Sequence, residues 1–89
     1  MCKNYYELRF NHFVATTADE TIFGSARESG GHTYNFIIRQ DSVRTQSGDL
    51  WLELDPVLAQ IVRNRVKQDY AKVPIYRTDR ILFGPLDSA

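Results

Sequence analysis

Two histidines are the residues of this chain that titrate near neutral pH, so they are the first candidates for acid–base chemistry. A pair of imidazoles can cleave RNA when one accepts a proton and the other donates one. His12 ends the first predicted strand and His32 begins the second. If these strands run parallel, the two rings lie at opposite ends of the sheet, and we expect both to be solvated.

Two glutamates, Glu7 and Glu53, fall on strands that we expect to be neighbours. Paired carboxylates can hold a magnesium ion for phosphoryl transfer, and a metal-dependent nuclease is therefore our third hypothesis for function. Arg9 falls on the same predicted face, and a cross-strand ion pair explains such a face equally well. We expect no metal and no other cofactor.

Tyr5, Arg9 and Trp51 are predicted on the sheet face that no helix covers. Tryptophan and tyrosine are favoured anchors of protein interfaces, so we interpret this face as the surface for a protein partner or for a second copy in a homodimer. Nucleic-acid bases also stack on exposed rings, which makes a single-stranded nucleic-acid-binding module the alternative. Repulsion of phosphates by Glu7 and Glu53 argues against that alternative.

A basic patch is predicted on the exposed face of the longest helical segment. Arg63 and Lys67 lie one turn apart there, surrounded by polar side chains. Cations late in a helix complement its dipole, so the patch is explained by a solvated face, or else by docking to an acidic partner or a phosphate backbone. We include both residues among the candidate binding residues.

The composition indicates one small globular domain over residues 1–89, with frayed ends near 1–3 and 85–89. Eleven lysines and arginines balance eleven aspartates and glutamates, which removes the general electrostatic argument for binding to DNA or to an anionic membrane. Cys2 is the one cysteine, so a reducing, cytoplasmic location is expected. No signal peptide and no stretch of ~18 apolar residues is present, so we expect no membrane association.

The element that must organise the fold is a helix over residues 55–72. Asp55 can cap its free amides, and Pro56 suits its first position. Apolar residues recur at steps of three and four and define a core face, which consists of Leu58, Ile61, Val62, Val66 and Tyr70.

Alternating apolar residues predict strands over 4–14, 32–39, 50–54 and 80–83, with the polar loop 41–49 extending two of them. In the third strand Leu50, Leu52 and Leu54 are expected to be buried beneath the helices. A capping box at 17–20 favours a short second helix over 17–29, although Gly24 weakens a helix and permits a strand there.

The predicted element order is βαββαβ, a ferredoxin-like α+β fold with both helices on one face of an antiparallel sheet. If residues 17–29 form a strand, the alternative is a β-meander packed by one long helix. No phosphate-binding loop or nucleophile motif is present. The sequence therefore favours a non-enzymatic module, a regulator or inhibitor that acts by protein–protein contact.

Overall fold

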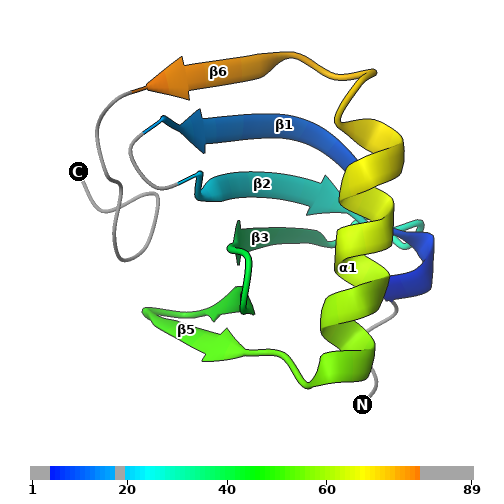
Figure 1. Ribbon diagram of the computed structural model, residues 1–89. Helices are drawn as coiled ribbons and strands as arrows, with labels where there is room; N and C mark the ends of the chain where they lie inside the picture. Colours follow the sequence, from blue (N-terminus) through cyan, green and yellow to red (C-terminus); the bar gives the residue numbers. More distant parts are fainter. Residues whose placement is uncertain (1–4, 18–19, 79–89) are drawn as a thin grey trace.

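The computed structural model describes residues 5–17 and 20–78. Five strands form an antiparallel meander, and α1 then returns the chain so that the last strand lies parallel to the first; the order across the sheet is β5-β4-β3-β2-β1-β6. Figure 1 shows α1 crossing the strands on one face. The elements are η1, a 3-10 turn (Tyr5–Glu7), β1 (Arg9–Thr16), β2 (Ile22–Arg27), β3 (Thr33–Ile38), β4 (Val43–Ser47), β5 (Leu50–Glu53), α1 (Pro56–Asp69) and β6 (Ile75–Thr78).

The α+β class is as predicted, but the strand order does not match the ferredoxin-like arrangement. That arrangement requires a helix between the first two strands, and β2 occupies most of the segment in which it was predicted. The described elements follow the alternative, a meander of strands packed by one long helix. The strand predicted at 80–83 lies outside the described residues, as do the predicted frayed ends.

The helix predicted over 17–29 is wrong because β2 occupies Ile22–Arg27. Thr16 and Thr21 close a β-hairpin where the capping box was expected. Thr16 N donates a hydrogen bond to the Thr21 carbonyl at 2.8 Å, and Thr21 N donates one to Thr16 Oγ1 at 3.1 Å. Gly24 lies in the strand, and the rings of Phe10 and Phe13 fill the space that a Cβ at this position would need. The glycine therefore serves close packing.

α1 confirms the predicted helix. The Asp55 carboxylate accepts a hydrogen bond from Leu58 N at 2.9 Å, and Pro56 takes the first turn. Val62 and Val66 are buried, whereas Leu58 and Ile61 are partly buried against the core. Among the described residues, no helix combines the length and apolar character needed to cross a membrane.

The core lies between α1 and the sheet. A bulge between Phe10 and His12 in β1 shifts the alternation, so Phe10 and Phe13 both face the helix and stack with centroids 5.0 Å apart. Phe36 of β3 and Val43 of β4 complete the buried set from the central strands. The pairing register places one row of residues across this face from β1 to β5: Phe13, Gly24, Phe36, Thr45 and Leu52.

Candidate protein-binding surface at the sheet edge

The β4–β5 hairpin places the last strand of the meander at one edge of the sheet. Gly48 adopts a positive φ of 61° in the two-residue turn, a conformation that glycine takes without strain. Gln46 Nε2 donates to the Gly48 carbonyl at 3.1 Å, and Leu54 N donates to the Val43 carbonyl at 2.9 Å. The hairpin is thus fixed at its turn and at the point where the chain leaves for α1.

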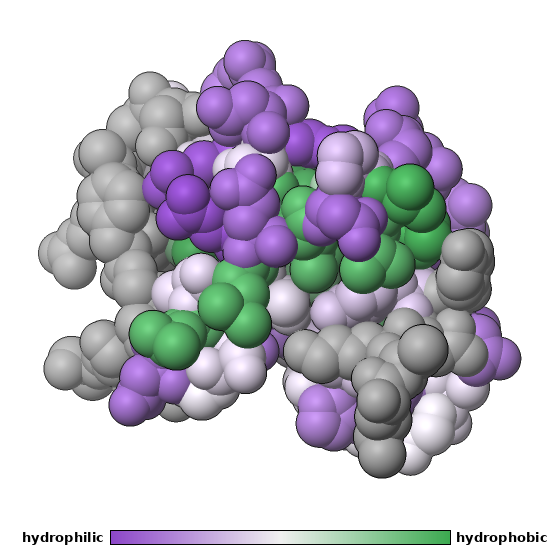
Figure 2. All heavy atoms as spheres, turned by 90° about the horizontal axis from the view of Figure 1, so that it is seen from below, coloured by the Kyte–Doolittle hydropathy of each residue, from purple (hydrophilic) through white to green (hydrophobic). Residues whose placement is uncertain are grey.

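Three of the four large hydrophobic side chains that the described residues expose lie on β5 and at the start of α1. Leu50 is 65% exposed, Leu52 48% and Val57 67%. We call these three residues the edge surface. Figure 2 views this side of the molecule and shows hydrophobic residues at the surface among hydrophilic ones. The fourth, Tyr76, lies in β6 at the opposite edge.

β5 pairs with β4 on one side only, since it is the last strand of the described sheet. An edge strand presents unpaired backbone N–H and C=O groups, and a second chain can pair with them. On β5 these groups run beside exposed leucines. The surface therefore offers both backbone hydrogen bonds and apolar contact to an extended segment.

For Leu50 and Leu52 the sequence predicted the face correctly and the burial incorrectly. Leu52 is the cross-strand partner of Thr45, which is buried, so the leucines point to the helix face as predicted. Their burial was predicted wrongly, because α1 packs most closely on β1, η1 and β4 and leaves both leucines exposed. The described residues leave this end of the face uncovered.

Trp51 lies on the opposite face of β5 and is half-buried. Its cross-strand partner is Gln46, whose Oε1 accepts a hydrogen bond from Asn35 Nδ2 at 3.0 Å. The indole Nε1 is buried and has no hydrogen-bond partner among the described residues. Buried donors are seldom left unpaired, so the surroundings of Trp51 lack the hydrogen-bond acceptor that a buried indole usually has.

Tyr5 is not on an exposed face, and this prediction is wrong. The residues before Arg9 turn in η1 instead of extending β1, and Tyr5 is 2% exposed. Its ring meets Tyr34 and Phe36 edge-on, at centroid distances of 5.6 and 5.8 Å. Burial raises the pKa of the Tyr5 hydroxyl. The nucleic-acid interpretation therefore loses one of its two stacking rings.

The predicted cations come from two elements, with Arg63 and Lys67 one turn apart on α1 and Arg9 in β1. Arg63 Nη2 donates to the Gln40 carbonyl at 3.1 Å, so this arginine ties α1 to the β3–β4 loop. It lines a hollow of about 280 Å³ together with Glu53. Lys67 is exposed one turn further along α1, and Arg9 is exposed at the start of β1. Arg63 and Glu53 thus lie at the β5 end of the molecule, and Arg9 does not.

The Glu7–Glu53 pairing is also wrong. Glu7 lies in η1, before β1, whereas Glu53 ends β5 on the far side of the meander. Over the part of the chain that the structure describes, no group of three or more histidine, cysteine, aspartate or glutamate side chains is positioned to hold a metal ion. Glu7 instead accepts a hydrogen bond from Ser29 Oγ at 2.8 Å.

Comparison with protein-family models, with curated proteins and with solved structures finds no match to this chain. The candidate site consequently depends on the geometry of the chain itself. Sequence reasoning missed two of its residues, since Leu50 and Leu52 were assigned to the core. It had a usable signal for Val57, which falls outside the apolar period of α1.

Proposed function

We propose that the protein is a non-enzymatic binding module that acts by protein–protein contact, with β5 as the strand to which its partner pairs. The observation that carries the proposal is the coincidence of an open edge strand with the exposed side chains of Leu50 and Leu52. Addition of an extended segment to a sheet edge is a common mode of recognition, in which backbone bonds supply affinity and alternate side chains supply specificity.

The docked segment would cover Leu50 and Leu52 on one face of β5 and would approach Trp51 on the other. Val57 at the start of α1 extends the apolar contact past the end of the strand. A small module that binds a partner through its edge strand in this way would act as a regulator or inhibitor. The single cysteine supports a cytoplasmic setting for it.

The test uses a photo-crosslinking amino acid at position 52 in cells that make the protein. Position 60 serves as the control, because Gln60 is exposed on α1 and polar. We expect position 52 to crosslink one protein that position 60 does not. The substitution Leu50→Lys should abolish the crosslink, since a lysine on an edge strand opposes strand pairing.

A crosslinked product of two copies of this chain would identify the partner as a homodimer mate, and Leu50→Lys should then make the protein monomeric. Equal products from positions 52 and 60 would overturn the proposal, because contact would not be specific to the edge. Nucleic acid as the main product at position 52 would overturn it in favour of the alternative function.

A further inference from the structure

Two arginines lie directly opposite each other where β1 begins and β2 ends. Arg9 and Arg27 are Cα partners in the antiparallel register, and both are exposed. Side chains in such a pair leave the backbone about 5 Å apart, and like charges in this position destabilise the sheet. The pair therefore concentrates positive charge at a cost in stability.

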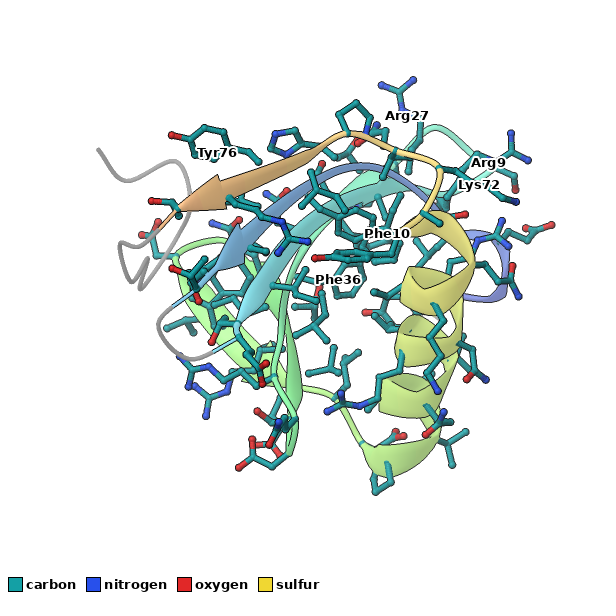
Figure 3. The ribbon with its side chains drawn as sticks, turned by 45° about the horizontal axis from the view of Figure 1, so that its top comes forward. Arg9, Phe10, Arg27, Phe36, Lys72 and Tyr76 are labelled. Atoms are coloured by element: carbon teal, nitrogen blue, oxygen red, sulfur yellow. The ribbon has the colours of Figure 1, made fainter. Side chains whose placement is uncertain are left out.

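The end of α1 brings a third cation to the same corner. Asp69 is buried and accepts a hydrogen bond from Phe10 N at 2.9 Å, which ties the last turn of α1 to β1. Lys72 follows in the turn, where its N–H donates to the Asp69 carbonyl at 2.9 Å. Figure 3 shows Arg9, Arg27 and Lys72 at this corner.

The carboxylates nearby are engaged with other groups. Asp69 faces Arg65 Nε at 3.4 Å, the one ion pair among the described residues. Glu7 accepts a hydrogen bond from Ser29 Oγ. Burial raises the pKa of the Tyr34 hydroxyl, and Glu28 lies close enough to Tyr34 to raise it further. Within residues 5–17 and 20–78, Arg9, Arg27 and Lys72 consequently have no carboxylate at ion-pair distance.

Two neighbouring hollows open between these cations. The larger, of about 660 Å³, is lined by both arginines, and the smaller, of about 440 Å³, by Arg9 and Lys72. Phe10 and Val73 line both hollows and give them an apolar wall. The space can hold an apolar side chain while the cations contact acidic groups on either side of it.

We propose that Arg9, Arg27 and Lys72 bind an acidic segment of a protein partner, in which carboxylates flank an apolar residue. Arginine forks donate well to carboxylates, and an acidic ligand would relieve the repulsion between Arg9 and Arg27. Glu7 and Glu28 line the larger hollow as well, and they repel any anion that passes close to them. Separate carboxylates can contact the cations and avoid the two glutamates, which a continuous phosphate backbone does less well. This site lies away from the edge surface and does not depend on it.

The test measures binding of a short capped peptide, glutamates around one leucine, by amide chemical shifts at low salt. Arg9→Gln and Arg27→Gln should each weaken binding about fivefold, as expected for the loss of one partly exposed ion pair. Arg77→Gln is the matched control. Arg77 is an exposed arginine on β6 that pairs with Ala15, near the end of β1 opposite to Arg9. Leu50→Lys should leave this binding unchanged, which separates it from the proposed edge function.

Arg27→Gln should also raise the thermal midpoint slightly at low salt, because it removes the opposed charge. Absence of peptide binding would overturn the proposal, as would equal weakening by Arg77→Gln or a lowered midpoint for Arg27→Gln. Tighter binding of an oligodeoxythymidine with the same number of charges would assign the corner to nucleic acid. Displacement of the peptide by inorganic phosphate at the peptide's own concentration would assign it to free oxyanions; either result contradicts the acidic-segment proposal.

Discussion

The two ends of one cross-strand row differ sharply in burial although all its residues face α1. Phe13 and Phe36 are fully buried in the row, whereas Leu52 at its β5 end is 48% exposed. The difference does not come from hydrophobicity, because leucine would suit the core equally well. It comes from coverage: α1 packs most closely on β1, η1 and β4, and the side chain of Leu52 lies outside that packing. Alternation in a sequence therefore reports which face a residue takes, and a second element decides whether that face is buried.

The largest effect should come from truncating the covered part of the row. Phe36→Ala removes a fully buried ring that contacts Phe10 and Tyr5, and we expect it to lower the free energy of unfolding by about 3–5 kcal/mol. Leu52→Ala should lower it by less than about 1 kcal/mol, because the side chain is half exposed already. Urea denaturation of the two variants measures both. Similar losses at the two positions would remove the contrast between the covered and open ends.

Gly24 offers a smaller test within the same row. A Cβ at this position would lie 2.6 Å from Cε1 and 2.9 Å from Cδ1 of Phe10, whose ring is buried and stacked on Phe13. Gly24→Ala should therefore destabilise the protein by about 1–3 kcal/mol through overpacking. Gly30→Ala is the control, since its Cβ would meet only Glu28 Oε1 at 3.6 Å. If calorimetry shows no difference between the two variants, the aromatic packing around β2 is not as described.

The start of α1, beside the open end of the row, should give a still smaller effect. Asp55→Ala removes the cap that accepts from Leu58 N and should cost about 1 kcal/mol in unfolding free energy. Asp55→Asn should retain nearly all of the stability, because asparagine caps equally well. Equal losses for both variants would show that the charge of Asp55 matters more than its hydrogen bond.

Local signals predicted α1 well because its determinants lie within the helix itself. Asp55 and Pro56 mark its start, and the spacing of Val62 and Val66 identifies the face that is buried. β2 was harder to predict, since Gly24 is compatible with either element until the packing of Phe10 on it is known. The capping-box pattern was misleading because Thr16 and Thr21 use their polar groups to close a hairpin.

The sites depend on long-range pairing, which single residues do not encode. Leu52 looks like a core residue until the reach of α1 is known, and Tyr5 looks like a strand residue until η1 turns it toward Tyr34. The opposition of Arg9 and Arg27 follows from the register of β1 and β2. That register could not be derived while residues 17–29 were assigned to a helix.

The smallest effect concerns the pH dependence of stability at the covered end. Burial, with a contribution from Glu28, raises the pKa of Tyr5 and of Tyr34 above the ordinary value of 10.0. The native state then holds these protons more tightly than the unfolded state, so the stabilisation is complete below pH 10 and is lost as the pH rises through the raised pKa values. The double variant Tyr5→Phe and Tyr34→Phe should show a shallower loss of stability above pH 10 than the parent protein. Tyr76→Phe, which removes an exposed hydroxyl on β6, should follow the parent curve, and a flattened curve for that variant would mean that the alkaline loss does not originate in the buried tyrosines.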